Sequence, residues 1–215
     1  MYPGINTISK SYIFRLFGTR GTALLLKSSI FSINHYYLMK GNLKFIPYLK
    51  IQNRLKGNFR KVTKEDIFSL KNRLETLSFY DKRELLSRIL FYNSGFTNCY
   101  GFFADNKIAY IQWLIYPSEN YIIEKDYATK FYPLSPKQVM IENAFTFPEY
   151  RGYGLYRTLT HKLCKQVYKE GYTTGLCYTR KDKTTPLNEF YLLGFKIDKL
   201  LTEYKFLFRT WRNLD

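Results

Sequence analysis

The sequence predicts a mixed α/β domain whose sheet is largely antiparallel and contains one parallel crossover. Strand-like and helix-like segments alternate from residue 59 onward, in the order strand, helices, three strands, helix, strand, helix, strands. Asp105-Asn106 joins two of the strand-like runs, and this pair is typical of a tight hairpin turn. A hairpin within an alternating order of elements favours a mixed sheet flanked by helices.

The first half of this region contains four expected elements. Residues 59–62 read as a short strand, and Thr63 followed by Glu65-Asp66 is typical of a capped helix start. Apolar residues then recur at helical spacing, and residues 82–91 predict a second helix. The runs at 99–104 and 107–116 predict the two strands of the hairpin.

The second half continues the alternation. Residues 139–147 form an apolar, partly alternating run that ends at a proline. A helix is predicted over residues 155–170, where one apolar stripe recurs every four residues and Gly171 closes the helix. A strand at 173–179, a short helix at 186–193 ended by Gly194, and a strand pair within 195–208 complete the chain.

Composition excludes several classes of protein. With 46% hydrophobic and 19% aromatic residues, the chain of 215 residues is not disordered, and its length suits one domain with some additional chain. Its three cysteines make no disulfide framework and lack zinc-site spacing, so we expect a reducing compartment and no metal. Charged or polar residues interrupt every long apolar stretch, which argues against a spanning helix or a signal peptide. We therefore expect a cytoplasmic protein.

The positive charge is concentrated at the N-terminus. The net charge is +17, and residues 1–64 contain twelve Lys or Arg residues and no acidic residue. A boundary near residues 48–58 divides a basic, aromatic-rich extension, residues 1–56, from a domain at residues 57–215. The extension, which reads as either a strand pair or an interfacial helix, could face a membrane surface or nucleic acid, and a solvated basic surface is the alternative.

The segment from residue 144 to 157 carries the strongest chemical signal. A strand ends at Pro148, Arg151 and the glycines Gly152 and Gly154 form a turn, and a helix begins at once. Glycines let backbone N–H groups turn inward, and the free amides of a helix N-terminus favour a phosphate. The loop is therefore a candidate phosphate site.

This segment resembles the phosphate-binding motif of the GNAT superfamily of N-acyltransferases, R/Q-x-x-G-x-G/A, with Arg151 as its first residue. Tyr156 stands where the family has a last small residue. Three further segments resemble the family's opening strand and helix cap, its hairpin and its closing Gly-Phe pair, at residues 59–67, 105–109 and 188–195. The resemblance covers about residues 59–208 and implies a sheet of six to seven strands flanked by helices.

The resemblance implies that acetyl-CoA or another short acyl-CoA is the co-substrate, with no metal. Its pantetheine arm would lie along the strand at 145–147 and bond to the backbone of Thr146, and its pyrophosphate would lie on residues 151–156. The implied cofactor-binding residues are Phe145, Thr146, Phe147, Arg151, Gly152, Tyr153, Gly154, Leu155, Tyr156, Arg157 and Asn188.

Three residues are candidates for the chemistry. Alternation places Glu142 on one strand face with Ala144 and Thr146, in an apolar run where burial would raise its pKa toward that of a useful base. The alternative for Glu142 is an exposed face. The family's tyrosine acid aligns with Phe190, so the neighbouring Tyr191 is the candidate acid, with a wet surface tyrosine as the alternative. Tyr178 aligns with a substrate-facing position.

The sequence thus predicts an N-acyltransferase that transfers an acyl group directly to a small-molecule or carrier-linked amine. The form of the loop, with a basic extension before the domain, is similar to members linked to cell-envelope polysaccharide, which suggests an amino-sugar acceptor and a peripheral place at the inner membrane surface. Two alternatives stay open: acetylation of an RNA-borne or ribosomal amine, and a non-catalytic CoA-binding module.

Overall fold

The computed structural model describes residues 10–47, 55–207 and 209–214. One sheet of eight strands organises the fold, in the spatial order β2-β3-β4-β5-β6-β1-β7-β8. All neighbouring strands are antiparallel except β5 and β6, which are parallel. The bounds of the strands are β1 Phe31–Asn42, β2 Asn58–Lys61, β3 Cys99–Ala104, β4 Lys107–Ile115, β5 Gln138–Thr146, β6 Thr174–Arg180, β7 Lys196–Phe206 and β8 Arg209–Arg212. The predicted fold class is confirmed.

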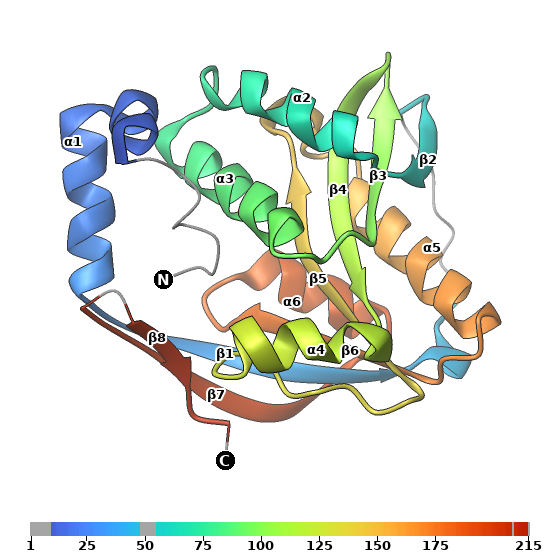
Figure 1. The fold of residues 1–215 in the computed structure, drawn as a ribbon. Helices are drawn as coiled ribbons and strands as arrows, with labels where there is room; N and C mark the ends of the chain where they lie inside the picture. The colour runs from blue at the N-terminus through green and yellow to red at the C-terminus, as the bar shows by residue number, and fades with distance from the viewer. Residues whose placement is uncertain (1–9, 48–54, 208, 215) are drawn as a thin grey trace.

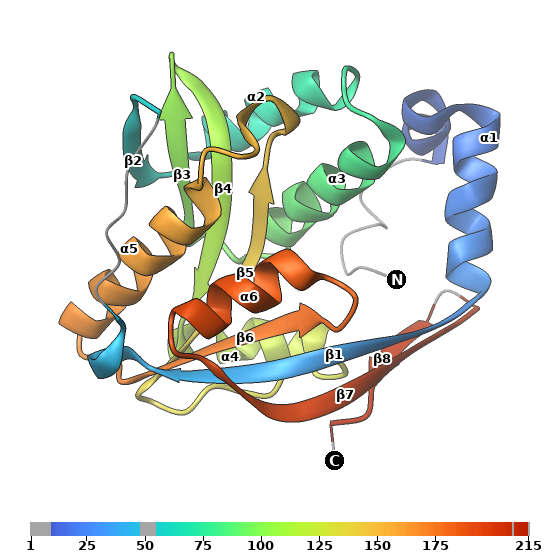
Figure 2. The same ribbon diagram turned by 180° about the vertical axis from the view of Figure 1, so that it is seen from behind.

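Helices cover both faces of the sheet. Figure 1 shows α2 (Lys64–Leu74), α3 (Phe79–Asn93) and α4 (Asn120–Ile122) on one face, with α1 (Lys10–Ile30) at the side. Seen from behind in Figure 2, α5 (Leu155–Lys169) and α6 (Thr184–Leu192) cover the opposite face. Met140 and Leu176 pack in the core on the α3 side, and Val139 and Cys177 pack in the core on the α5 side. The alternation of a strand thus gives each face its own core.

Local sequence signals fix several of these elements. Thr63 caps α2 through a reciprocal box, in which its hydroxyl accepts from the Asp66 N–H and the Asp66 carboxylate accepts from the Thr63 N–H. Asp105 and Asn106 both have positive φ, 48° and 59°, as the predicted hairpin turn requires. The predicted helices at 155–170 and 186–193 correspond to α5 and α6.

The N-terminal region contributes one helix and one strand. Helix α1 is interrupted at Gly18, whose φ of 66° lies in the left-handed region. Strand β1 then pairs with β6 on one side and β7 on the other. Residues 31–42 of the predicted extension therefore lie within the same sheet as the predicted domain, and part of the expected boundary, residues 48–54, is outside the described residues.

Phe195 explains how β1 fits beside β6. Gly41 on β1 pairs with Gly175 on β6. A Cβ at Gly41 would lie 2.5 Å from the Phe195 ring, and one at Gly175 would lie 2.8 Å from it. The two glycines therefore make room for one buried aromatic ring that follows α6.

The end of the chain differs from the prediction. The run at 195–208 was expected to hold both strands of a pair, whereas β7 alone occupies Lys196–Phe206 and its partner β8 is Arg209–Arg212. The turn between them includes Leu207 at a φ of 44° and has neither glycine nor proline. With β1 and β8 included, the sheet has eight strands rather than six or seven.

Candidate active site

A gap opens in the middle of the sheet, between the two parallel strands. Strands β5 and β6 pair over only three positions, from Gln138 with Thr174 to Met140 with Leu176. Two residues further along each strand lie Glu142 and Tyr178, which the same register would pair. The carboxylate of Glu142 instead accepts a hydrogen bond from the Tyr178 backbone N–H at 2.5 Å. A side chain thus satisfies a strand amide that the separating ladder leaves without a backbone partner.

A β-bulge gives β5 its change of direction. Ile111 of β4 pairs with Phe145 and Trp113 pairs with Glu142, so the single residue Gln112 faces two residues of β5. One of those two, Asn143, has a φ of 56°, a conformation that asparagine tolerates better than most residues. A bulge of this kind bends its strand and re-aims the side chains beside it.

The bulge overturns the predicted alternation on β5. Glu142 was expected to share a face with Ala144 and Thr146, but the extra residue puts Glu142 on the face of Phe145. Phe145 packs in the core on the α3 side, whereas Ala144 packs against the group that contains Leu155 of α5. Glu142 therefore faces the α3 side of the sheet, together with Tyr178.

Glu142 has the electrostatic character of a base. Burial raises the pKa of its carboxyl to about 7, and the Tyr178 N–H together with the charges of Arg212 and Arg88 oppose a larger rise. The side chain is half-buried. A carboxylate with this pKa exchanges protons near neutrality, as general acid–base catalysis requires.

Tyr178 lies beside Glu142 and is held in place. Its hydroxyl accepts a hydrogen bond from the Tyr132 N–H at 3.0 Å, and its ring packs against Phe131 at a centroid distance of 5.1 Å. Burial raises the pKa of the Tyr178 hydroxyl, so it stays protonated. The structure thus brings together two of the three predicted catalytic residues.

The predicted phosphate loop follows directly from β5. Gly152 and Gly154 have φ values of 85° and 73°, and a Cβ added at either one would meet open space. Helix α5 begins at Leu155, and its first bond to the loop runs from the Thr158 N–H to the Gly154 carbonyl. The amides of the first turn have no partner within the helix, so the loop offers N–H donors beside an open surface that fits a phosphate.

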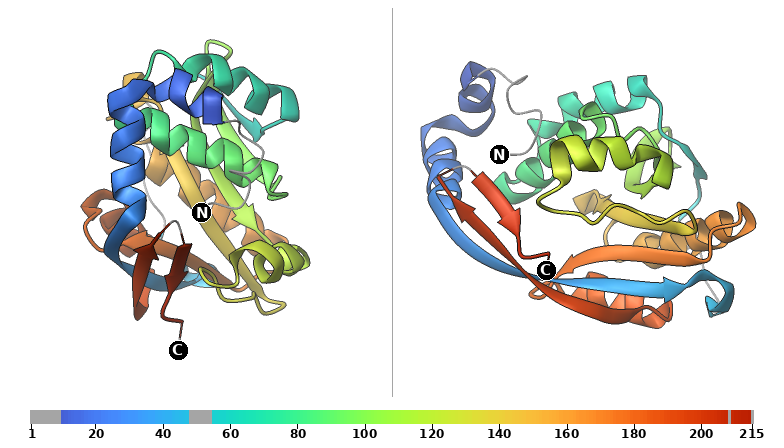
Figure 3. Two further views of the ribbon diagram at one scale, coloured as in Figure 1. Left: turned by 60° about the vertical axis from the view of Figure 1, so that its left-hand side comes forward. Right: turned by 60° about the horizontal axis from the view of Figure 1, so that its bottom comes forward.

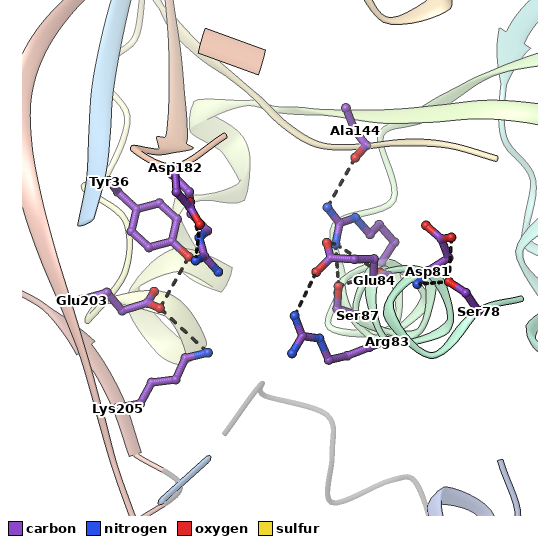
Figure 4. A network of polar contacts seen from close by, with 12 residues as sticks. Tyr36, Ser78, Asp81, Arg83, Glu84, Ser87, Ala144, Asp182, Glu203 and Lys205 are labelled. Carbon is purple, nitrogen blue, oxygen red and sulfur yellow. Dashed lines mark hydrogen bonds and ion pairs between the residues drawn. The ribbon is translucent and has the colours of Figure 1, made fainter. Parts of the chain in front are cut away.

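Two ion pairs fasten the loop to the helices of the other face. Arg73 of α2 pairs with Glu149, and its guanidinium lies 3.4 Å from the centroid of the Phe147 ring. Arg151 pairs with Asp81, and its Nε donates to the Thr146 carbonyl at 3.3 Å. Asp81 itself belongs to the cap of α3 with Ser78, as Figure 4 shows. Arg151 therefore holds the loop in place and also carries a positive charge.

Two of the predicted cofactor residues, Arg157 and Asn188, lie at a shallow depression of about 540 Å³ between α5 and α6. Arg157, Asn188 and Tyr191 line it. Arg157 makes a double ion pair with Glu189, at 2.6 and 3.0 Å, which ties the two helices together. Tyr191 is exposed at this depression, whereas Glu142 faces the α3 side. The structure thus groups Tyr191 with the predicted cofactor residues.

Tyr156 and Phe190 are the two residues that differ from the family's pattern, at its last small residue and at its tyrosine acid. Phe190 is buried and packs against Phe195, and Tyr156 meets the Phe190 ring edge-on at 6.2 Å. Tyr156 also meets Tyr110 edge-on at 6.2 Å. A large side chain at position 156 therefore fills a space between α5, α6 and the sheet. Of its neighbours, Leu155 is buried in the core and Tyr153 is exposed.

A cluster of positively charged side chains was not predicted from the sequence, and two of its members, Arg88 and Arg212, act electrostatically on Glu142. Its cations come from α3, from β6 and the turn after it, and from β7 and β8, namely Arg83, Arg88, Arg180, Lys183, Lys205 and Arg212. Figure 4 shows Lys205, Glu203 and Asp182 facing Arg83 and Glu84 of α3 from the opposite side. Burial is the main cause that lowers the pKa of Lys205, and the charges of Arg83, Arg180 and Arg212 lower it further. No periodicity marks this set, because four separate elements supply it.

Acids offset only part of this charge. Glu84 pairs with Arg88 at 2.5 Å and more weakly with Arg83 at 3.7 Å. Asp182 pairs with Arg180. Glu203 pairs with Arg212 at 3.2 Å and with Lys205 at 4.0 Å. The Arg88 guanidinium also donates to the Ala144 carbonyl at 3.3 Å, which fixes α3 to the bulge. Six cations against three paired acids leave an excess of positive charge in this cluster, of which Arg88 and Arg212 act on Glu142.

Solved structures share this architecture. No protein-family model and no curated protein matches the chain. A GNAT-family acetyltransferase from Novosphingobium aromaticivorans is similar over 80% of this chain and 63% of its own, at a TM-score of 0.52 and 14% identity. A GCN5-related N-acetyltransferase from Sphaerobacter thermophilus matches 91% of this chain and 56% of its own, at a TM-score of 0.54 and 10% identity.

A third similar structure is a GCN5-related glucosamine N-acetyltransferase region of a fungal multi-domain β-N-acetylglucosaminidase, at a TM-score of 0.58 and 13% identity. It matches 90% of this chain and 23% of its own. The chain thus spans less than two thirds of the length of each of these structures. The likeness shows that this chain has the fold of the GNAT N-acetyltransferases.

Two further observations concern the described residues alone. Within residues 10–47, 55–207 and 209–214, no group of three His, Cys, Asp or Glu side chains is placed to hold a metal ion. No helix of that part of the chain combines the length and apolarity needed to cross a membrane.

Proposed function

We propose that this protein is an N-acyltransferase that transfers an acetyl or other short acyl group from acyl-CoA directly to an amine. The observation that carries the proposal is the arrangement along β5. Glu142, with a pKa of about 7, lies where β5 leaves β6, and the glycine loop that suits a phosphate begins after the same strand. A base in the middle of one bent strand and an anion-binding loop after the end of that strand match the needs of this reaction.

The loop and the depression would hold acyl-CoA. The amides at the start of α5 would bind the pyrophosphate, because Gly152 and Gly154 leave the approach open. The backbone of Thr146 would bond to the pantetheine arm, and Arg157, Asn188 and Tyr191 would line the path between α5 and α6. Acyl-CoA supplies the activated thioester carbonyl.

Glu142 would accept the proton that the amine loses as its nitrogen bonds to the thioester carbon. The carbon–sulfur bond then breaks, and the thiolate takes a proton from a tyrosine, for which Tyr191 is the candidate on the cofactor side. Solvent reaches the exposed Tyr191 hydroxyl and would return the proton. Tyr178 would position Glu142 through its N–H and present its ring to the acceptor.

The charge beside Glu142 favours an acceptor that carries a negative group. Arg83 and Lys205 each share an acid with a closer cation, so an incoming phosphate or carboxylate would complete their coordination. An amino sugar linked to phosphate has both the amine and the anion. The three free cysteines are buried, which suits the reducing cytoplasm that we propose as its compartment.

Acetylation by the purified full chain tests this proposal. Acetyl-CoA would be supplied with glucosamine and, in parallel, with glucosamine 6-phosphate, and mass spectrometry would follow the acetylated product. We expect the phosphorylated amine to react with the higher kcat/KM. Arg83→Gln should raise KM for this amine about tenfold and leave KM for acetyl-CoA unchanged, whereas Lys169→Gln on α5 should change neither.

Other outcomes would select the alternatives. Saturable acetyl-CoA binding without turnover on any amine would favour a non-catalytic binding module, for which the buried Phe190 in place of a tyrosine is the supporting observation. Turnover on an RNA-borne or ribosomal amine would replace the amino sugar as acceptor. Absence of acetyl-CoA binding would overturn the proposal.

A further inference from the structure

One face of the sheet is left uncovered near the N- and C-terminal strands. Strand pairing places Phe31 opposite Phe206, Ile33 opposite Tyr204, and Tyr204 opposite Trp211. Residues paired in an antiparallel sheet point to the same side, so these five side chains share one face. The Tyr204 and Trp211 rings stack at a centroid distance of 5.8 Å, which agrees with this placement.

The same face is buried further along β1. Met39 is fully buried and packs in one core with Phe190 of α6. The cover by α6 does not reach the other end of the strand, where Phe31 is 62% exposed and Phe206 is 51% exposed. Figure 3 shows β1, β7 and β8 continuing past the helices as a curved extension of the sheet.

The neighbourhood of this face is apolar and positively charged. Ile30 and Leu207, both exposed, adjoin it at the junction of α1 with the sheet, where the Leu207 N–H bonds to the Ile30 carbonyl. Arg209 pairs with Phe206 and so lies on the face, and Lys27 is in the last turn of α1. Glu203 is the only acid within residues 20–37 and 199–214, and it is buried on the opposite face with Arg212.

We infer that this face, defined by Phe31, Ile33, Tyr204, Phe206, Arg209 and Trp211 and called the outer face below, docks on an anionic lipid bilayer. Aromatic rings insert at the boundary between headgroups and acyl chains, and Arg209 and Lys27 would meet lipid phosphates. A second copy on this face would bring like charges together, and nucleic acid would leave Ile33 and Phe206 without an apolar partner. A bilayer satisfies both the charge and the apolar surface.

The two tryptophans provide a direct test on the full chain. Trp113 is fully buried, whereas Trp211 is 40% exposed on the outer face, so a change of emission on adding vesicles reports Trp211. Vesicles of phosphatidylcholine with one third phosphatidylglycerol should shift the emission to shorter wavelength and sediment with the protein. Brominated acyl chains should quench the emission, and pure phosphatidylcholine should bind at least tenfold more weakly.

Variants separate insertion from simple charge attraction. Phe31→Ser combined with Phe206→Ser should lower the affinity for anionic vesicles at least tenfold, whereas Phe68→Ser, at an equally exposed phenylalanine on α2, should not change it. Unchanged circular dichroism would show that the double variant is folded. If the protein sediments with vesicles but the Trp211 emission does not shift, the inference is overturned. It is also overturned if the protein is a dimer in solution and the double variant is a monomer.

Discussion

Glu142 and Tyr178 lie two residues beyond the last paired residues of β5 and β6, and the Tyr178 N–H donates to the Glu142 carboxylate instead of to a backbone carbonyl. Because a side chain takes the place of the backbone acceptor, the strands can separate here without leaving the Tyr178 amide unsatisfied. The same contact also holds the base in place by a bond to the backbone, which no rotation of a neighbouring side chain would break. The hydrogen bond between Glu142 and the Tyr178 N–H therefore accounts both for the separation of the strands and for the position of the candidate base.

Replacing Glu142 by Gln should remove a pH-dependent step. In the wild type, kcat/KM should rise with pH through about 7 as Glu142 loses its proton and becomes a base. Glu142→Gln should lower kcat by about 10²- to 10⁴-fold and abolish this limb of the profile on the same acceptor. If kcat/KM of the variant still rises with pH through about 7, the group that titrates is not Glu142.

The same carboxyl should affect stability with a defined sign. Its pKa in the folded protein is about 7 against an ordinary value of 4.5, so the unfolded chain loses this proton first as the pH rises. The wild type should therefore lose stability relative to Glu142→Gln between pH 4.5 and 7, by roughly 1–3 kcal/mol, with no further change above that range. Urea unfolding of both proteins at four pH values measures the difference.

Gly154→Glu should abolish acetyl-CoA binding, because its carboxylate would occupy the open side of the loop and repel a phosphate. Gly171→Glu is a matched control, since Gly171 also has a positive φ and open space around its added Cβ but lies at the other end of α5. Both variants place a glutamate at a positive φ, 73° at residue 154 and 95° at residue 171, which costs about 1 kcal/mol or more. Calorimetry at moderate salt should detect binding only in the control, and equal loss in both would attribute the effect to strain.

Tyr191→Phe should lower kcat about 10²-fold without changing the affinity for acetyl-CoA, because only the hydroxyl is removed. Presteady-state release of CoA would locate the defect in the step that frees the thiolate. Tyr156→Phe is the informative comparison, since Tyr156 meets the ring of Phe190 from α5. A large loss in Tyr156→Phe with none in Tyr191→Phe would move the acid to α5.

Gly41→Ala should destabilise the fold by about 1–3 kcal/mol, because the new methyl group would lie 2.5 Å from the Phe195 ring. Combining it with Phe195→Leu should cost less than the sum of the two single changes, since the smaller side chain leaves room. A double-mutant cycle in urea measures this coupling. Strict additivity would mean that β1 does not lie against Phe195.

Most elements between residues 59 and 194 were predictable because their signals are local. The Thr63 cap, the Asp105-Asn106 turn and the apolar stripe of α5 each depend on residues within a few positions of one another. The glycine loop was readable for the same reason. Its two left-handed residues are both glycine, and the helix starts immediately after them.

Three features depended on contacts that a local pattern does not contain. Strand β1 takes its place from pairing with residues more than 130 positions away. The bulge at Asn143 shifts the alternation of β5 by one residue, so Glu142 lies on the face of Phe145 and not on the predicted face of Ala144 and Thr146. The cluster of positively charged side chains draws on four elements, and only the fold assembles them.

The position of β1 sets an order of events during synthesis. Residues 31–42 leave the ribosome more than 130 residues before their partner strands, at 174–180 and 196–206. Until then the first strand carries unpaired edges and apolar residues such as Leu38 and Met39 with nothing to cover them. Strand β1 therefore joins the sheet only after both of its partner strands have been synthesised, at a rate limited by a search across more than 130 residues. A nascent chain stalled before residue 196 should remain a client of chaperones.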